Sequence, residues 1–371
     1  MSGVPNLLAI DPGSACTRVG LFCDAEPVLI RDLQHGKAAL KACGPEVISQ
    51  FQLRLLCIEI ELESCGLKLD RIAAVAGRGG LLHPVPGGTY RVNEEMLEEL
   101  RRAERGEHVA NLGAFLAHAI ASRMGVPAYI VDPISVDEWA KVARFSGCAQ
   151  LERTCFSLAL NCKAVARRFA LEAGESYENL RLVVAHLGSG HTISAHALGR
   201  MIDSTNSRED GAFSTERSGS VPAMELVRLC FSGRYTQKQI ENMLTREGGL
   251  VSYLGTGDLR EVEQRIEQGD QYAGLVFRSM VYQIAKEIGA MSCALQGRVD
   301  AIVITGEMSH SRRLTCAVCE AVKWIAPIKV YPGGNELRAL AEGVLRVMRN
   351  EEPGREFGDD VPETVMTNAG S

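Results

Sequence analysis

Two short glycine-containing turns carry residue types that suit a bound phosphate group. Asp11-Pro12-Gly13-Ser14 follows an apolar segment, and Gly188-Ser189-Gly190 comes shortly after His186. In such turns backbone N–H groups can donate to phosphoryl oxygens, and a carboxylate such as Asp11 can hold metal-bound water. Each turn alone is also compatible with ordinary turn chemistry. Because the two turns recur about half a chain apart, the pair favours phosphate binding.

Two arginines lie in glycine-containing segments that could place a guanidinium group beside such a phosphate. Arg78 lies within Gly77-Arg78-Gly79-Gly80, and Arg217 lies within Glu216-Arg217-Ser218-Gly219. Guanidinium groups can offset the charge of a transferring phosphoryl group, and they can hold a carboxylate with two hydrogen bonds. From the residues alone, a pair of arginines in surface salt bridges fits the sequence about as well.

The sequence contains none of the commoner nucleotide-binding or hydrolytic motifs. It has no G-x-x-x-x-G-K-[ST] loop, no protein-kinase glycine loop with its catalytic loop, and no G-x-S-x-G elbow. The histidines lack metal-ligand spacing. The single C-x-x-C, from Cys316 to Cys319, has no second cysteine pair, so we expect two cysteines on one helix face. If ATP binds this chain, it uses another scaffold, and a hydrolase is disfavoured.

Length and composition indicate an ordinary globular protein of two domains. The 371 residues exceed one ordinary hydrophobic core, and 46% of them are hydrophobic. The net charge of −6 leaves no broad basic surface, so no nucleic-acid partner is expected. Without a signal-like start at Met1 to Ile10 or a long uncharged apolar run, no membrane partner is expected either. The 12 scattered cysteines are typical of reduced thiols, which predicts a cytoplasmic location.

Each of the two turns is expected to connect a pair of strands. Residues 7–10 and 17–22 are apolar or alternating, which predicts a hairpin around the first turn, with a third strand at 27–31. Residues 182–186 and 192–197 repeat this pattern around the second turn. A pattern that recurs in this way indicates a duplicated fold.

The remaining patterns predict helices and strands around these hairpins. Residues 71–76 are expected to form a strand that runs into the Arg78 segment, and residues 301–305 a strand that ends where Gly306 begins another turn. Residues 350–371 are charged and contain proline, which predicts a frayed tail. The other expected elements are helices over residues 45–65, 93–105, 111–124, 272–295 and 337–349, and a strand over residues 128–131.

A series of longer segments, spread from about Leu7 to Arg349, has the character of one family. These segments include Gly77-Arg78-Gly79-Gly80-Leu81-Leu82, Gly87-Gly88-Thr89-Tyr90, Glu107-His108 with Asn111-Leu112-Gly113, Ile130-Val131-Asp132-Pro133, Glu216-Arg217-Ser218-Gly219 and Tyr331-Pro332-Gly333. Together they resemble the butyrate kinases, which fall within the superfamily of acetate and sugar kinases, actin and heat-shock ATPases.

The resemblance implies an α/β fold of two RNase H-like, actin-like ATPase domains with a nucleotide cleft between them. The implied N-terminal domain covers residues 1–131 and is completed by 337–371, and the implied nucleotide-binding domain covers 132–336. The implied reaction is reversible transfer of the γ-phosphoryl group between ATP, with Mg²⁺, and the carboxylate of a short-chain fatty acid. The implied partners are thus a small carboxylate and a nucleotide, and the implied assembly is a homo-oligomer, a dimer or larger.

The resemblance also implies roles for individual residues. Arg78 and Arg217 would flank the transferred phosphoryl group, and Asp132 would lie near the substrate carboxylate; these are the implied catalytic residues. Glu336 and Asp11 are implied for Mg²⁺. The implied nucleotide-binding residues are Asp11, Gly13, Ser14, Arg18, His186, Gly188, Ser189, Gly190 and Gly306.

The chain departs from the family pattern at several positions. Ser157 stands where the resemblance implies a histidine near the phosphoryl group, and Ser189 and Glu307 each replace a glycine. A side chain at position 189 is expected to crowd the phosphate or strain its turn. Cys16 and Arg18 replace a serine and a lysine in the first turn. Two hypotheses remain open: an active kinase for butyrate, with acetate, propionate or branched-chain acids as alternative substrates, and a degenerate paralogue that binds nucleotide or acyl phosphate.

Overall fold

The computed structural model describes residues 6–65 and 72–358. The chain divides into two compact units: the first unit comprises Met1–Asp137 with Asn335–Ser371, and the second unit comprises Glu138–Gly334. Arg71, which begins the strand expected over 71–76, and residues 359–371 of the expected tail lie outside the described residues. The first unit is discontinuous in sequence, because the chain returns to it after the second unit.

A mixed β-sheet forms the centre of the first unit. Its described strands are β1 (Asn6–Pro12), β2 (Cys16–Cys23), β3 (Glu26–Gln34), β4 (Ile72–Arg78), β5 (Thr89–Arg91), β6 (Ala128–Val131) and β12 (Arg355–Glu356). Their order is β12-β5-β6-β4-β1-β2-β3. β1 is antiparallel to β2 and parallel to β4, and β4 is parallel to β6. The carboxyl ends of β1, β4 and β6 therefore meet at one edge of the sheet.

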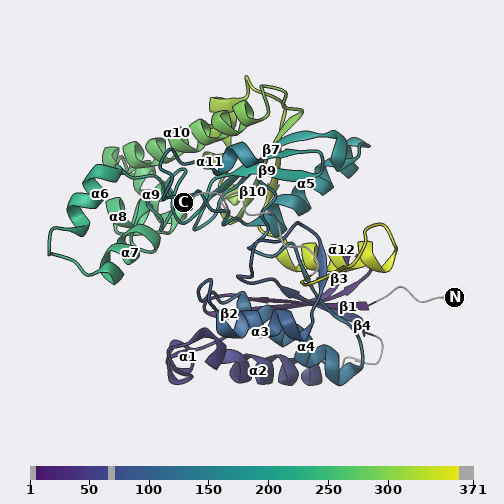
Figure 1. Cartoon of the computed structure of the whole chain (residues 1–371). Helices are drawn as coiled ribbons and strands as arrows, with labels where there is room; N and C mark the ends of the chain where they lie inside the picture. The colour runs from purple at the N-terminus through teal and green to yellow at the C-terminus, as the bar shows by residue number, and fades with distance from the viewer. Residues whose placement is uncertain (1–5, 66–71, 359–371) are drawn as a thin grey trace, which may run out of the picture. The chain divides into compact units, whose positions relative to one another are not determined.

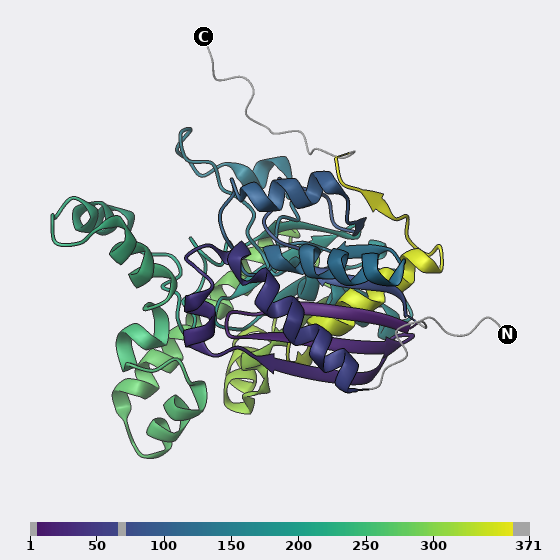
Figure 2. The same cartoon turned by 90° about the horizontal axis from the view of Figure 1, so that it is seen from below.

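Helices cover both faces of this sheet (Figure 1). They are α1 (Lys37–Ala42), α2 (Phe51–Ser64), α3 (Glu94–Arg102), α4 (Asn111–Met124) and α12 (Glu336–Met348), and the 3₁₀ turn η1 (Val47–Gln50) precedes α2. α2, α3 and α4 share one apolar core with Leu8 and Ile10 of β1. α12 packs on β1, β2 and β4, on the opposite face. Figure 2 shows α2 lying across the purple strands. Because β1 is covered on both faces, residues 7–10 are fully buried, as an apolar central strand requires.

Two glycines bring α4 into direct contact with β4. A Cβ on Gly113 of α4 would lie 2.2 Å from the carbonyl oxygen of Arg78, and a Cβ on Gly77 would lie 2.1 Å from the carbonyl oxygen of Gly113. Both distances are far below van der Waals contact, so only glycine permits this approach of backbone to backbone. The contact between these two glycines therefore fixes how close α4 lies to the end of β4, which carries Arg78.

A second mixed sheet forms the centre of the second unit. Its described strands are β7 (Arg181–His186), β8 (Thr192–Ala197), β9 (Arg200–Ser204), β10 (Ala301–Gly306) and β11 (Ile328–Pro332). Their order is β11-β10-β7-β8-β9, with β10 parallel to both β7 and β11. β7 and β8 form an antiparallel hairpin.

The second unit contains helices that cover the two faces of its sheet and helices that contribute to neither apolar layer. They are α5 (Ala159–Ala173), α6 (Ala223–Cys230), α7 (Gln237–Thr245), α8 (Gly249–Leu254), α9 (Leu259–Glu267), α10 (Gln271–Ala294) and α11 (Arg312–Val322), with the 3₁₀ turn η5 (Glu307–His310) after β10. Val183 and Ala185 of β7 pack with α10 and α11, whereas Leu182 and Val184 pack with α5. Successive side chains of β7 therefore point alternately into the two apolar cores.

The predicted duplication of the strand, turn, strand pattern is confirmed. In each unit a three-stranded antiparallel ribbon, β1-β2-β3 or β7-β8-β9, lies at one edge of the sheet, and its first strand pairs in parallel with a later strand. The architecture agrees with the predicted α/β class.

Two predictions about elements are corrected. The helix expected over 45–65 is divided into η1 and α2, because the chain changes from the 3₁₀ to the α-helical form at Phe51. The tail is not frayed throughout: β12 pairs with β5, and Phe357 is buried at 3% exposure. That pairing and burial hold residues 355–357 against the sheet. Within residues 6–65 and 72–358, no helix combines the length and apolar character needed to cross a membrane.

Candidate active site

The turn between β1 and β2 is a tight hairpin turn, as predicted. The backbone N–H of Gly13 donates to the carbonyl oxygen of Cys16 at 2.8 Å, and the strand register places Asp11 opposite Arg18. Arg18 reaches in two directions: its Nε donates to Asp32 at 3.3 Å, and its Nη1 lies 3.7 Å from a carboxylate oxygen of Glu336. The predicted residues of this turn therefore lie beside the start of α12.

Asp11, Arg78 and Glu336 form a charged cluster at the carboxyl edge of the first sheet. Arg78 follows β4 residue Gly77, which is paired with Ile10, so Arg78 and Asp11 leave adjacent strand ends together. Nη1 of Arg78 donates to Oδ1 of Asp11 at 3.0 Å, and Asp11 is 5% exposed. Burial lowers the pKa of Arg78, but the Asp11 and Glu336 carboxylates outweigh it, and the pKa is raised overall.

Glu336 is the first residue of α12, where the helix end favours a negative charge. Burial raises the pKa of its carboxyl group, Arg78 acts in the opposite direction, and Asp11 raises the pKa further. Two carboxylates and one guanidinium thus share a small volume. An additional cation beside the carboxylates would relieve the repulsion between them.

The donor set of this cluster suits Mg²⁺ in a limited way. No group of three or more histidine, cysteine, aspartate or glutamate side chains that could hold a metal occurs among the residues the structure describes. Mg²⁺ commonly keeps several waters and binds through one or two carboxylates together with substrate phosphates. Asp11 and Glu336 fit that demand, because both carboxylates border Arg78 at the same edge.

Arg54 supports the first turn, although the sequence did not predict this role. This α2 residue is 0% exposed, and its guanidinium group donates to the carbonyl oxygen of Cys16 at 3.0 Å and to Oγ1 of Thr17 at 2.9 Å. Thr17 is also hydrogen-bonded to His35 at 2.8 Å. A charged residue in a helix normally lies on an exposed face, so the sequence pattern did not indicate its burial.

Asp132 lies at the same edge, but its carboxylate has a structural partner. It follows Val131, which pairs with Arg78, and its φ of +37° is a left-handed conformation that few non-glycine residues adopt. The Gly88 N–H donates to its Oδ1 at 2.8 Å, and the Asp132 N–H donates back to the Gly88 carbonyl at 2.9 Å. These bonds hold the loop at Gly88, and proximity of Asp132 to a substrate carboxylate stays a prediction.

In the second unit, the predicted turn at 188–190 connects β7 to β8. His186 ends β7 and is 6% exposed, and its Nε2 would lie 3.3 Å from a Cβ on Gly188, so the ring borders the turn. Ser189 is exposed and has an ordinary negative φ, which corrects the expectation that its side chain strains the turn. The Ser189 side chain is accommodated because it points to solvent.

Arg217 packs directly against this turn. A Cβ on Gly190 would lie 2.5 Å from Nη1 of Arg217, so the guanidinium group occupies the space that a side chain at 190 would need. Nη1 donates to the backbone carbonyl of Ser207 at 2.8 Å and to its hydroxyl at 2.6 Å. No carboxylate among the described residues lies within ion-pair distance of it. Burial and nearby Arg208 lower the pKa of Arg217, with Glu216 opposing them.

Gly306 also joins this region. Its φ is +93°, and a Cβ there would lie 2.2 Å from the carbonyl oxygen of Leu187, so only glycine lets the end of β10 approach the start of the turn. Gly306 and Gly333 exchange backbone hydrogen bonds of 3.1 and 3.2 Å. Glu307, the residue in place of a glycine, accepts a hydrogen bond from the N–H of Gly334 at 3.3 Å.

The predicted site residues thus fall into two groups, one in each unit. Asp11, Gly13, Ser14, Arg18, Arg78, Asp132 and Glu336 belong to the first unit, and His186, Gly188, Ser189, Gly190, Arg217 and Gly306 belong to the second. Convergence of Arg78 and Arg217 on one phosphoryl group stays a prediction.

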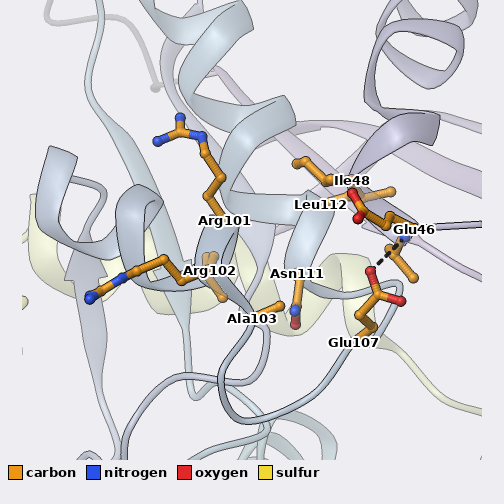
Figure 3. Close-up of a pocket in the computed structure, with 10 residues that line it drawn as sticks. Glu46, Ile48, Arg101, Arg102, Ala103, Glu107, Asn111 and Leu112 are labelled. Atoms are coloured by element: carbon orange, nitrogen blue, oxygen red, sulfur yellow. Dashed lines mark hydrogen bonds between the residues drawn. The ribbon is translucent and has the colours of Figure 1, made fainter.

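A cavity of about 380 Å³ lies elsewhere in the first unit. Figure 3 shows Arg101 and Arg102 of α3 on one side and Glu46 and Glu107 on the other, with Glu107 accepting a hydrogen bond of 3.0 Å from the backbone of Val47. None of the predicted site residues lines this cavity. Its charges belong to surface residues that differ from both groups above.

Comparisons with known proteins agree with the fold described above. Residues 161–336 match the sequence model of the acetokinase family. The Porphyromonas gingivalis acetate kinase structure has 16% identity and a TM-score of 0.75, over 93% of this chain and 100% of that one. The Entamoeba histolytica acetate kinase has 16% and 0.73, and a Francisella tularensis propionate kinase has 17% and 0.71, each over 91% of this chain and 98% of its own. The protein therefore shares the two-domain, actin-like ATPase fold of these kinases, and its residues 161–336 carry an acetokinase-family sequence.

Proposed function

We propose that this protein is an ATP-dependent carboxylate kinase that transfers a phosphoryl group between ATP and a short-chain fatty acid, with butyrate as the preferred substrate class. The observation that carries the proposal is Arg217, a partly buried guanidinium group that packs on a glycine turn and has no carboxylate within ion-pair distance in the described part of the chain. A buried cation without a counter-ion is costly unless an anion binds beside it. The match of residues 161–336 to the acetokinase family supports a phosphoryl group as that anion.

In the proposed reaction the acid carboxylate attacks the γ-phosphorus in line, and ADP leaves. A carboxylate is a nucleophile at neutral pH, so no strong general base is needed, and positioning with electrostatic stabilisation supplies the rate. Arg217 stabilises the charge on the transferred group, and the turn at 188–190 offers backbone N–H groups to phosphate oxygens. We place the nucleotide in the second unit, Glu138–Gly334, which lies within the nucleotide-binding domain that the sequence predicts over 132–336.

The cluster of the first unit completes the proposal. Asp11 and Glu336 would hold Mg²⁺, which when bound neutralises charge on the nucleotide phosphates. Arg78, balanced by Asp11, orients that carboxylate, and Arg18 borders Glu336. Gly13 and Ser14 provide the first turn, and Asp132 remains the residue proposed near the acid carboxylate.

The test is trapping of acyl phosphate by hydroxylamine. Purified protein is offered MgATP with acetate, propionate, butyrate or isobutyrate in separate reactions, and hydroxamate is measured. We expect the highest yield with butyrate or isobutyrate. A matched control is Arg260→Ala, which removes an exposed arginine of α9 and should leave the yield unchanged. Hydroxamate formed best with acetate or propionate would keep the kinase but overturn the butyrate assignment.

A second candidate is a binding module without turnover. It is favoured by Ser157, which is fully buried where the resemblance implied an imidazole; the thiol of Cys155 donates to its hydroxyl at 3.8 Å. A neutral hydroxyl cannot offset charge as an imidazolium can. Raised thermal stability with MgATP but no hydroxamate from any acid would put this candidate first.

A further inference from the structure

His191 is a buried imidazole whose two ring nitrogens make no hydrogen bond with residues 6–65 or 72–358. It follows Gly190, the last residue of the second turn, and it is 3% exposed. Neither Nδ1 nor Nε2 has a hydrogen-bond partner among the described residues. By contrast, His196, a buried histidine of β8, is hydrogen-bonded to Tyr177 at 2.7 Å and to Ser194 at 2.8 Å. Buried polar groups are nearly always satisfied, so His191 calls for a partner that comes from outside the protein.

The surroundings of His191 indicate the chemistry of that partner. The groups that act on it electrostatically are His186 at the end of β7 and Arg217 against Gly190; both disfavour positive charge on its ring. Arg208 likewise disfavours the positive charge of Arg217, and the carboxylate of Glu216 favours that charge. On the side of α5, the adjacent Thr192 accepts a hydrogen bond of 3.4 Å from the Leu158 N–H, and the nearby Ser157 is neutral. Cationic and donor groups around an unsatisfied ring favour an oxyanion, not a metal cation.

The protein groups around His191 determine the protonation state of its ring. Burial, with His186 and Arg217, lowers the pKa of His191 to about 3, so the imidazole is neutral at physiological pH. An oxyanion placed against the ring and the Arg217 guanidinium group would reverse this balance, because the negative charge favours the imidazolium form. Binding of the anion is then linked to uptake of a proton from solvent.

We propose that His191 is a phosphoryl-binding residue that takes up a proton when the transferred phosphoryl group arrives and donates a hydrogen bond to one of its oxygens. The inference rests on the proposed function, and it adds a residue of the second turn that the sequence reading did not single out. It also supplies an imidazole to a region where Ser157 provides none.

The test uses sulfate as the probe, since sulfate is a dianion that does not itself titrate near neutral pH. Calorimetric titrations of the full chain in two buffers of different ionisation enthalpy give the number of protons taken up per sulfate. At pH 6.5 we expect uptake of about one proton per sulfate in the unaltered protein, and therefore an affinity that falls by about tenfold or more between pH 6 and pH 8. Binding without uptake, or no binding at millimolar sulfate, overturns the proposal.

Three variants assign the proton to a residue. His191→Asn keeps a donor but cannot titrate, so uptake should vanish and affinity should lose its pH dependence. His196→Asn removes the neighbouring buried histidine of β8, and uptake should persist. Loss of uptake in His186→Asn, with uptake retained in His191→Asn, would assign the proton to His186 and overturn the proposal.

A second measurement observes the protonation of the ring nitrogens directly. In the unaltered protein with ¹⁵N-labelled histidine, one pair of ring nitrogens should change from neutral to imidazolium shifts on addition of sulfate, and the pair is assigned by its absence from His191→Asn or, if that variant does not fold, from His191→Gln. An unchanged set of ring shifts overturns the proposal. Because sulfate needs neither ATP nor an acid, this result is independent of the hydroxamate assay, so failure of the kinase and failure of this assignment are distinguishable.

Discussion

The β1-β2 turn and the β7-β8 turn occupy the same position in their units but differ in charge balance. At the first turn Arg78 and Arg18 each have a carboxylate partner: Arg78 is paired with Asp11, and Arg18 with Asp32 and Glu336. At the second turn the Arg217 side chain donates to the carbonyl and hydroxyl of Ser207 and has no carboxylate partner among the described residues, and His191 lies nearby. A duplicated strand, turn, strand frame therefore carries two complementary functions, a carboxylate site suited to a cation and an electropositive site suited to an anion.

The largest effect should come from removing the unpaired charge of the second turn. Arg217→Ala should lower kcat by about a thousandfold, because a preorganised group that stabilises transition-state charge is lost, while ATP binding remains measurable. Arg217→Lys keeps the charge without the planar fork and should recover only part of the rate. Steady-state kinetics and ATP titrations check both variants, and unchanged turnover in Arg217→Ala would refute the role given to it.

Removing the guanidinium group that supports the first turn should lower the stability of the protein. Arg54→Met leaves the acceptors of Cys16 and Thr17 buried without a donor, which should reduce the free energy of unfolding by about 3 kcal/mol. Arg123→Met, an exposed arginine of α4, should change it by less than about 0.5 kcal/mol. Urea denaturation of both variants makes the comparison. Equal stabilities would mean that Arg54 does not hold the turn.

The second turn should make stability depend on pH. The pKa of His191 is lowered to about 3 in the folded chain and is near 6.5 when unfolded. Below pH 6.5 the unfolded state therefore binds more protons, and stability falls as pH falls, by on the order of 2 to 3 kcal/mol between pH 7 and pH 4.5. Thermal unfolding across this range should be flatter in His191→Asn, and added sulfate should restore part of the lost stability.

The Mg²⁺ concentration that activity requires should depend on the two carboxylates beside the first turn. Glu336→Gln removes one of two carboxylates, and we expect the Mg²⁺ concentration for half-maximal activity to rise by about tenfold. Glu342→Gln, on the same helix but paired with Arg338 at the surface, is the matched control and should leave it unchanged. An unaltered magnesium dependence in Glu336→Gln would remove this residue from the metal site.

The fold was largely predictable from sequence, because the hairpins have strong local signals. Residues 192–197 and 111–124 alternate or repeat with clear periods, and their bounds agree with β8 and α4. The contacts within the two groups of site residues were harder to predict from the sequence. Arg18 and Glu336 were indicated by the resemblance, and Arg78 already by its glycine-containing segment, whereas their pairing depends on the register between β1 and β4 and on the place where α12 begins.

What the sequence could not indicate was burial against the local trend. Arg54 is a charged residue in a helix, a kind of residue that is normally exposed. His191 has no sequence spacing typical of a ligand, because its lack of a hydrogen-bond partner among the described residues arises from tertiary packing. Ser189 was expected to strain its turn, but a residue's φ follows from the turn type and not from family pattern. The short strand β12 was missed because two residues are too few to show alternation.

The contact between Gly77 and Gly113 has a consequence for engineering. Replacing a glycine within a helix by alanine usually stabilises a protein, by up to about 1 kcal/mol, and Gly113 near the start of α4 would be an obvious choice. Here a methyl group would meet the Arg78 backbone at 2.2 Å and push helix and strand apart. A stability screen that counted only folded protein could accept such a variant after repacking, while the displaced strand end carried Arg78 away from Asp11. Consensus or propensity-based stabilisation of this chain should therefore leave both glycines untouched.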